Sequence, residues 1–306
     1  MSKKIGFIGQ GWIGRNYAND FENRGFAVVR YSLEEPHMHN GDKIADCDIV
    51  FIAVPTPTTT KGFNDSILRE AIKKIGKGKI AVIKSTILPG TTESIQTEYP
   101  DSLILHSPEF LRESSAAHDA AHPNRNIIGI PLDNETYRQA AQTVLSVLPK
   151  AGYELVCSAK EAELVKYMGN GFLYLKVVYV NMLYDLAKAL DCRWETVAEA
   201  FAADPRIGAS HLKPVHASGP SFAEASQDKK ASEGKHASEK GGRGAGGHCF
   251  IKDFAALTEL YKKMVGDELG VKALDAIKDK NLDLLIKTKK DLDLLMGVYG
   301  EKITKQ

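Results

Sequence analysis

A glycine-rich turn near the start of the chain constrains its fold more than any other feature. An apolar run over residues 4–9 leads directly into the pattern G-x-G-x-x-G and then into a helical stretch over residues 12–24. Glycines at these spacings let a strand turn sharply into a helix, and let the backbone approach a pyrophosphate at the helix N-terminus. A glycine turn without a ligand is the alternative. The pattern predicts a dinucleotide-binding turn formed by Gly9, Gly11, Trp12, Ile13 and Gly14.

The rest of the first half alternates short apolar runs with helical stretches. The runs lie at residues 27–31, 49–54, 80–84, 103–106 and 127–130. This alternation is typical of a parallel sheet covered by helices on both faces. We therefore expect an α/β fold with a Rossmann-type domain over residues 1–150.

The second half of the chain is helical in pattern. Apolar residues recur at intervals of three and four over residues 159–202 and 271–298, which predicts long helices. Between them, a segment rich in Ser, Gly, Ala and Lys cannot bury enough apolar surface to offset the entropy of ordering. We expect an all-helical domain over residues 151–306, with a mobile inserted loop at about 215–245.

Charge and cysteine content exclude several classes of protein. The 306 residues carry 40 Lys and Arg against 39 Asp and Glu, so the basic surface of a nucleic-acid binder is missing. The longest apolar run is far shorter than the ~20 residues that cross a bilayer, and no signal-peptide pattern precedes the first strand. The four cysteines are widely spaced, unlike a disulfide framework or zinc site. We expect a cytoplasmic enzyme with no metal and no nucleic-acid or membrane partner.

The cofactor expected at the glycine turn is NAD. The acidic residue that usually ends the second strand and binds the ribose 2′-hydroxyl is replaced by Ser32. Ser32 can still bind a ribose, and Glu34 can substitute for the acid. The nearby Arg30 leaves NADP as an alternative cofactor. Ligands of open α/β sheets bind beyond the carboxyl ends of the strands. The loops after later strands therefore add Val54, Pro55, Thr56 and Thr86 to the expected site.

Two further groups of residues are candidates for chemistry. Lys166 and Asn170 lie four residues apart on a predicted helix, so both project from one face; a solvated helix surface is the alternative. Cys249 follows two glycines at the expected start of a helix, with Asp253 one turn later. A helix N-terminus favours thiolate over thiol, which makes a cysteine nucleophilic, although a small buried cysteine is the commoner case.

Taken in order, these motifs resemble the nucleotide-sugar 6-dehydrogenases, in particular the UDP-glucose 6-dehydrogenases. The resemblance runs from Gly6 to about Asn281 and rests on the strings PEFLRE, KYMGN, DPRIG and GGHCFIKD. It implies a helical domain like that of 6-phosphogluconate dehydrogenase after the Rossmann domain. It also implies an enzyme that oxidises the C6 alcohol of a nucleotide sugar to a carboxylate with two NAD, most simply UDP-glucose to UDP-glucuronate.

The resemblance also implies roles for individual residues. Cys249 is the nucleophile that captures the aldehyde, Lys166 and Asn170 stabilise the oxyanion, and Asp253 holds Lys166 or the water. Thr86 and Glu109 position a water for proton transfer. Glu113 lies near the nicotinamide and Lys252 near the cofactor phosphates, while Arg206 reaches the sugar of a neighbouring subunit, which implies a homodimer. The further substrate-binding residues are Phe110, Leu111, Arg112, Lys213 and Gly246.

The chain also departs from the family pattern. It ends at Gln306, where we expect a third, UDP-binding domain to be absent. An insertion precedes the GGHC string, so the substrate diphosphate is expected on a partner chain or on the basic residues Lys229, Lys230, Lys235, Lys240 and Arg243. Two other functions stay open. One is a two-electron β-hydroxyacid dehydrogenase with Lys166 as base; the other is a non-catalytic dinucleotide-binding subunit.

Overall fold

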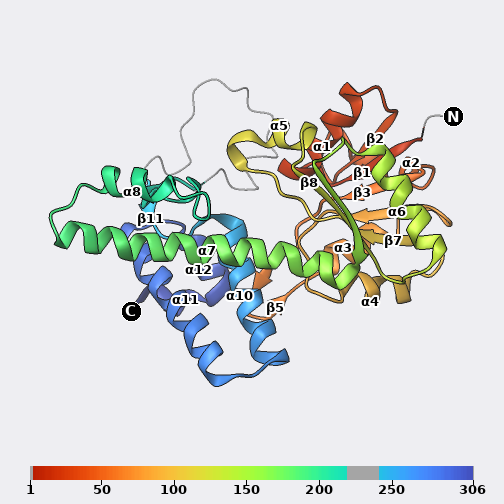
Figure 1. Ribbon diagram of the computed structural model, residues 1–306. Coiled ribbons are helices and arrows are strands. Elements are labelled where there is room, and N and C mark those ends of the chain that lie inside the picture. Colours follow the sequence, from red (N-terminus) through yellow and green to blue (C-terminus); the bar gives the residue numbers. More distant parts are fainter. Residues whose placement is uncertain (1–2, 219–240, 306) are drawn as a thin grey trace. The chain divides into compact units, whose positions relative to one another are not determined.

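The structure is a computed structural model that describes residues 3–218 and 241–305 (Figure 1). The contacts between residues divide the chain into two compact units. The first unit contains the residues up to Pro57 together with Phe63–Lys166. The second contains Thr58–Gly62 and the described residues from Tyr167 onward. The first unit therefore extends past residue 150, where the sequence placed the domain boundary.

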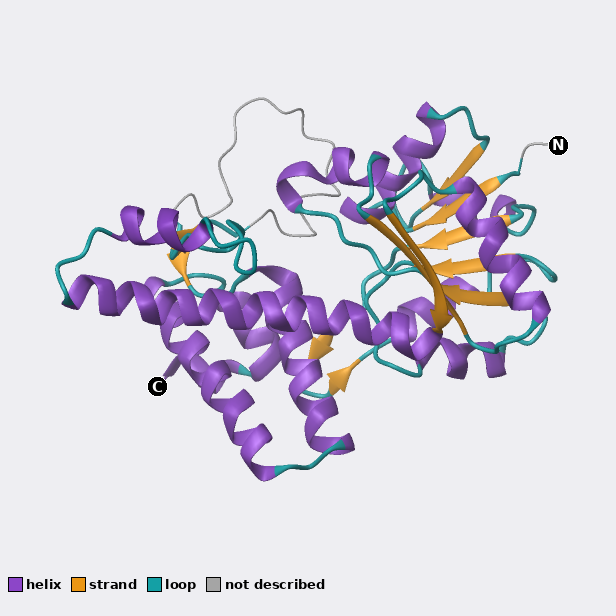
Figure 2. Cartoon of the chain, in the orientation of Figure 1, coloured by secondary structure: helices purple, strands orange, loops and turns teal. Residues whose placement is uncertain are grey.

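One seven-stranded sheet with surrounding helices forms the first unit (Figure 2). The strands are β1 Ile5–Ile8, β2 Val28–Tyr31, β3 Ile49–Ile52, β6 Ile80–Ile83, β7 Leu103–His106, β8 Arg125–Ile130 and β9 Tyr153–Ser158. Their order is β2-β1-β3-β6-β7-β8-β9, and the first five run parallel. This arrangement confirms the predicted Rossmann-type sheet.

The last two strands differ from the all-parallel sheet that the sequence predicts. β8 runs antiparallel to β7, with His106 opposite Gly129, and β9 pairs in parallel with β8. The sequence did not predict β9, because this strand lies at the edge of the sheet and its partly exposed residues form no continuous apolar run. It follows the position expected for the end of the domain.

Two separate apolar cores lie on the two faces of this sheet. The helices of the unit are α1 Trp12–Asn23, α2 Gly41–Ile44, α3 Ser66–Ile72, α4 Thr91–Glu98, α5 Ala116–Ala121 and α6 Glu135–Val147, with 3-10 turns η1 Met38–Asn40 and η2 Glu113–Ser115. From β3, Ile49 and Phe51 enter the core that contains residues of α1 and α6, whereas Val50 and Ile52 enter the core that contains residues of α3 and α4. Successive strand residues point to opposite faces, so this alternation explains why helices cover both.

The second unit is mainly helical, as predicted. Its elements are the part of α7 (Ala159–Ala189) from Tyr167 on, α8 Trp194–Ala202, α10 Gly247–Met264, α11 Glu268–Thr288, α12 Leu292–Tyr299 and η3 Glu301–Lys305, with β4 Thr58–Thr59 paired to β5 Gly62–Phe63. Tyr174 of α7 stacks on Phe254 of α10 with the ring centroids 3.9 Å apart. Val177 and Val178 lie in the same buried cluster. One face of α7 therefore contributes to the core of this unit.

The helix expected over residues 271–298 is in fact two helices. The chain breaks between α11 and α12, where Lys289 and Asp291 both have φ of +54°. Between them, the buried Lys290 ammonium donates a hydrogen bond to the Gly244 carbonyl at 3.2 Å. A local pattern of apolar residues carries no sign of this distant partner, so the sequence predicted a continuous helix.

The ends of the predicted loop at 215–245 are paired. β10 (Val215–His216) forms an antiparallel ladder with β11 (Gly242–Arg243). The Arg243 guanidinium, which the sequence placed on a substrate-binding loop, donates to the Asn181 side chain at 2.9 Å and pairs with Asp185 at 2.7 Å. Residues 219–240, with the four lysines of that loop, lie outside the described residues.

Among residues 3–218 and 241–305, no helix is both long enough and apolar enough to span a membrane.

Candidate functional site

The glycine turn between β1 and α1 is as tight as its sequence predicts. Gly9 has a φ of +90°, and a Cβ atom there would lie 2.2 Å from the Ala53 carbonyl oxygen. A Cβ atom on Gly14 would lie 1.9 Å from the Gly9 carbonyl oxygen. Gly11 is the N-cap of α1 and makes no side-chain cap. Because side chains are excluded here, the first-turn amides of α1 can face an anion.

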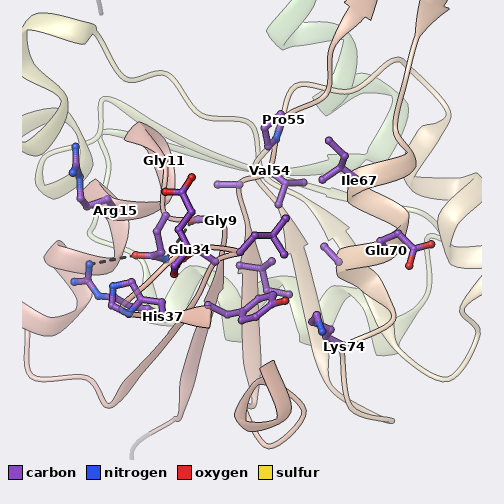
Figure 3. Close-up of a pocket in the computed structure, with 18 of the residues that line it drawn as sticks. Gly9, Gly11, Arg15, Glu34, His37, Val54, Pro55, Ile67, Glu70 and Lys74 are labelled. Atoms are coloured by element: carbon purple, nitrogen blue, oxygen red, sulfur yellow. Dashed lines mark hydrogen bonds between the residues drawn. The ribbon is translucent and has the colours of Figure 1, made fainter. Parts of the chain in front are cut away.

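A cavity of about 530 Å³ lies beyond the carboxyl ends of β1, β2 and β3 (Figure 3). Of the predicted cofactor residues, Gly9, Gly11, Ser32, Val54 and Pro55 line it. Trp12, Ile13, Gly14, Thr56 and Thr86 are not among the lining residues. The sequence did not predict the wall formed by Ile67, Glu70 and Ala71 of α3 and by Lys74 just after it.

This cavity fits a dinucleotide. Its volume lies within the range of ~300–1,000 Å³ usual for small-molecule sites. The turn at Gly9 and Gly14, which has no room for a Cβ atom, adjoins the N-terminus of α1, where a pyrophosphate can bind. Gly9 and Gly11 can hold the pyrophosphate, and the end of β2 can hold a ribose. When bound, the dinucleotide would accept a hydride.

A buried ion pair joins two residues that the sequence placed 57 positions apart. The Lys166 ammonium lies 2.6 Å from Glu109 Oε1, and both side chains are less than a tenth exposed. The other carboxylate oxygen of Glu109 accepts the Leu111 amide at 2.8 Å. The pair places one cation and one anion away from bulk water. Electrostatic interactions are stronger in such a buried environment than in water.

Thr86 lies at the end of a neighbouring strand. Its carbonyl accepts the Thr56 hydroxyl at 2.7 Å, so Thr56 supports the strand end that carries Thr86. That Thr86 and Glu109 position a water stays a prediction.

Lys84, to which the sequence gave no role, lies in the same unit. Its ammonium donates to the Ser107 hydroxyl at 3.0 Å and lies 4.5 Å from the centre of the Tyr17 ring. Burial lowers the pKa of Lys84 to about 7. The neighbouring His106 is neutral, because burial and the Lys84 charge lower its pKa to about 3. Only packing reveals this cluster, since its members come from separate strands and a helix.

Glu163, on the first turns of α7, is a buried carboxylate. It accepts hydrogen bonds from the Gly90 amide at 2.6 Å and from the Thr92 amide and hydroxyl at 2.8 and 2.6 Å. Loss of hydration outweighs these donors and raises the pKa of Glu163 to about 7. The contacts tie α7 to the start of α4.

Replacing Glu163 with glutamine is expected to change how stability depends on pH. The raised pKa means that the folded carboxyl binds a proton more tightly than the unfolded one, so wild-type stability falls as pH rises from about 4.5 to 7. Between pH 5 and 8, wild-type protein should lose about 2 kcal/mol relative to Glu163→Gln in urea unfolding. Glu161→Gln, at an exposed position on the same helix, serves as the control. A difference independent of pH would contradict this assignment.

Cys249 lies in the first turn of α10, in the second unit. The helix begins at Gly247 after the N-cap Gly246, and Cys249 is exposed. The predicted position at a helix N-terminus is therefore confirmed. The other exposed cysteine among the described residues, Cys192, lies in the turn between α7 and α8.

The turn before Cys249 is anchored by residues from the α11–α12 region. The Asn281 amide both accepts from the Ala245 amide at 2.7 Å and donates to its carbonyl at 3.0 Å. Asp291 accepts the Gly247 amide at 2.8 Å. A Cβ atom on Gly246 would lie 2.0 Å from Asp291 Oδ2, so packing alone requires glycine there.

Asp253 is a buried carboxylate of α10. It accepts from the Asn170 amide at 2.6 Å and contacts the Lys252 ammonium at 2.5 Å. Asp253 thus orients Asn170, and Lys252 balances its charge. The predicted roles of Asp253 toward Lys166 or a water, and of Lys252 toward the cofactor phosphates, stay predictions.

The remaining predicted residues each have local partners or positions within their own unit. The Arg125 guanidinium lies 3.7 Å from the Phe110 ring centre, and Arg112 pairs with Asp119 at 2.6 Å. Glu113 begins η2. Arg206 is exposed and pairs with Asp204 two residues away at 2.6 Å. Lys213 lines a second cavity of about 440 Å³ beside α8.

Comparison with known proteins finds two matching ranges. Residues 35–146 match the NAD binding domain of the UDP-glucose/GDP-mannose dehydrogenase family, and residues 160–227 match its central domain. UDP-glucose 6-dehydrogenase YwqF of Bacillus subtilis is 29% identical over 272 residues, which cover 85% of this chain and 54% of YwqF. The chain spans about half the length of such bacterial relatives.

Solved structures show the same fold. A UDP-glucose dehydrogenase from the hyperthermophilic archaeon Pyrobaculum islandicum has a TM-score of 0.73 at 25% identity, over 94% of this chain and 70% of that one. The 3-hydroxyisobutyrate dehydrogenase of Mycobacterium tuberculosis has a TM-score of 0.64 at 16% identity, over 93% and 95% of the two chains, and shares the fold. The matched family ranges take up more than half of the 306 residues, in the order of the sheet and helical units. The chain belongs to the UDP-glucose/GDP-mannose dehydrogenase family.

Proposed function

We propose that this chain oxidises the C6 alcohol of a nucleotide sugar, UDP-glucose first, to the uronic acid with NAD. The observation that carries the proposal is Cys249 in the first turn of α10, in a unit where Asp253 also orients Asn170. A two-electron alcohol oxidation has no need of a thiol, whereas a four-electron oxidation needs a nucleophile to capture the aldehyde. The names of the relatives above support the same substrate class.

The proposed reaction proceeds in four steps. The C6 hydroxyl loses its proton to water and C6 loses a hydride, which gives the aldehyde; a second hydride leaves after capture of the aldehyde, and a bound NAD would accept each hydride. The Cys249 sulfur forms a C–S bond to the aldehyde carbon, and the oxygen gains a proton to give a thiohemiacetal. Loss of hydride and of that proton leaves a thioester. Water then adds to the carbonyl, the C–S bond breaks, and the thiolate leaves the carboxylate product.

Charged and polar residues of the two units have separate roles in this scheme. Lys166 supplies a cation to the oxygen anions that form at C6, and Asn170 supplies a neutral donor held by Asp253. Glu109, with Thr86, handles the water and its protons. Glu113 and Lys252 are proposed at the cofactor, and Phe110, Leu111, Arg112, Arg206, Lys213 and Gly246 at the substrate.

The proposal is tested by stoichiometry. Purified protein with UDP-glucose and excess NAD should form two reduced cofactors and one uronate per sugar consumed. One reduced cofactor per substrate would favour a β-hydroxyacid dehydrogenase with Lys166 as base. No reduction with any nucleotide sugar would favour a non-catalytic dinucleotide-binding subunit.

We further propose that a stripe of apolar residues on α7 forms a homodimer interface. Met168, Phe172, Tyr179, Met182 and Leu186 recur at helical spacing and are 45–64% exposed. The opposite face of α7 packs into the core through Tyr174, Val177 and Val178. Contiguous exposed apolar surface of this kind marks an interaction site, and a second copy of the chain offers the same helix.

Charged substitutions in this stripe are expected to dissociate the dimer. Phe172→Glu with Leu186→Glu places two like charges on each side of the interface, so the measured mass should fall to that of one chain in analytical ultracentrifugation. The matched control is Leu269→Glu, which is 76% exposed on α11 and should leave the mass unchanged. A monomeric wild-type protein would refute the interface.

A further inference from the structure

The end of β2 lacks the acid that usually selects NAD, but the next residues supply one. The Ser32 hydroxyl, at the usual acid position, donates to the Glu34 backbone carbonyl at 2.8 Å. This bond closes a short turn just after the strand. Both residues line the cavity at the glycine turn, and Figure 3 shows the Glu34 side chain extending towards Gly11. Ser32 therefore acts as a support for Glu34.

Arg30 is the residue that a 2′-phosphate would need, and each of its three guanidinium nitrogens already donates a hydrogen bond within the protein. Its Nε and Nη2 atoms donate to the two carboxylate oxygens of Glu22 at 2.9 and 2.7 Å. Nη2 also donates to Asn19 at 2.7 Å, and Nη1 donates to Gln10 at 3.4 Å. A bidentate pair of this kind is among the stronger charge-assisted contacts, so the Arg30 charge is balanced within the protein.

The other charged residues that line the cavity have different positions or partners. Lys74 has its ammonium 4.8 Å from the Tyr31 ring centre. In Figure 3, Lys74 and Glu70 stand across the cavity from Gly11, while Arg15 follows the glycine turn on α1. Glu35 pairs with His39 at 2.8 Å. Arg15 is suited to the pyrophosphate, and Glu34 is the acid that extends towards the turn.

We infer that Glu34, supported by Ser32, binds the ribose hydroxyls of NAD, and that the Glu22–Arg30 pair withholds the cation that NADP requires. This inference rests on the cofactor site proposed above. A carboxylate accepts hydrogen bonds from a free 2′-hydroxyl but repels a 2′-phosphate. The site therefore selects the dinucleotide that lacks this phosphate, through a residue two positions beyond the usual one.

Equilibrium binding of NADH and NADPH, followed by cofactor fluorescence with the full chain, tests the inference. Wild-type protein should bind NADH at least ~100-fold more tightly than NADPH. Glu34→Gln should weaken NADH binding about tenfold, because a hydrogen bond to a charged group is lost, without weakening NADPH binding. Glu22→Ala should leave NADH binding unchanged and strengthen NADPH binding about tenfold by releasing Arg30.

Glu35→Gln is the matched control, because it removes the same charge from the adjacent residue. It should leave the NADH-to-NADPH ratio as in wild type. A wild-type protein that binds NADH, with an unchanged ratio in Glu34→Gln, would overturn the inference and leave the cofactor assignment standing. A wild-type protein that binds neither dinucleotide would overturn the cofactor assignment itself. Thermal unfolding of each variant should match wild type, since Glu34 and Glu35 are exposed.

Discussion

Replacing Cys249 with serine is expected to abolish formation of the sugar acid. A serine hydroxyl in the first turn of α10 is a far weaker nucleophile than the thiolate proposed to capture the aldehyde. Uronate production should fall by at least ~10³-fold. The first oxidation should still occur, so the variant stalls after one reduced cofactor or accumulates a covalent ester, detectable by mass spectrometry of the intact chain.

The matched control for this experiment is Cys192→Ser. Cys192 is also exposed, but it lies in the turn between α7 and α8, so its loss should leave the two-to-one stoichiometry intact. A Cys249→Ser variant with undiminished activity would instead favour a two-electron dehydrogenase. Alkylation of wild-type protein with iodoacetamide provides an independent readout, since protection of Cys249 by bound substrate requires that the thiol lie at the site.

Replacing Lys166 with methionine is expected to reduce both stability and activity. The variant leaves the Glu109 carboxylate buried without its cation, and breaking a buried pair costs about 3–5 kcal/mol of unfolding free energy. Loss of the proposed oxyanion donor should lower kcat by about 10²–10³-fold. Urea unfolding and steady-state kinetics measure the two effects separately.

The double variant Lys166→Met with Glu109→Gln separates packing from chemistry. It removes both charges together, so most of the lost stability should return while kcat stays low. Lys160→Met is the control, because Lys160 lies on the same helix and pairs with Glu93 at 2.6 Å in an exposed position. Exposed pairs contribute at most ~1 kcal/mol. A double variant that recovers activity would show that Lys166 acts only through stability.

Most of the fold could be predicted because its signals are local. The strand–turn–helix at Gly9–Gly14 and the apolar runs of β1, β3 and β6 depend on residues a few positions apart. Predictions failed where a distant partner decides the conformation. β9 escaped because an edge strand needs no continuous apolar run, and the break at Lys289–Asp291 escaped because Gly244 and Gly247 hold it from 44 to 46 positions away.

The same division applies to the candidate site. By itself, the sequence determined the glycine turn, the helical spacing of Lys166 and Asn170, and the place of Cys249 at a helix start, since each depends on neighbouring residues. Only the tertiary structure decided that Lys166 pairs with Glu109, that Asp253 holds Asn170, and that Ser32 supports Glu34. These contacts depend on tertiary packing or on the path of a turn. The pattern of residue types along the sequence does not determine which charged side chains pair with each other.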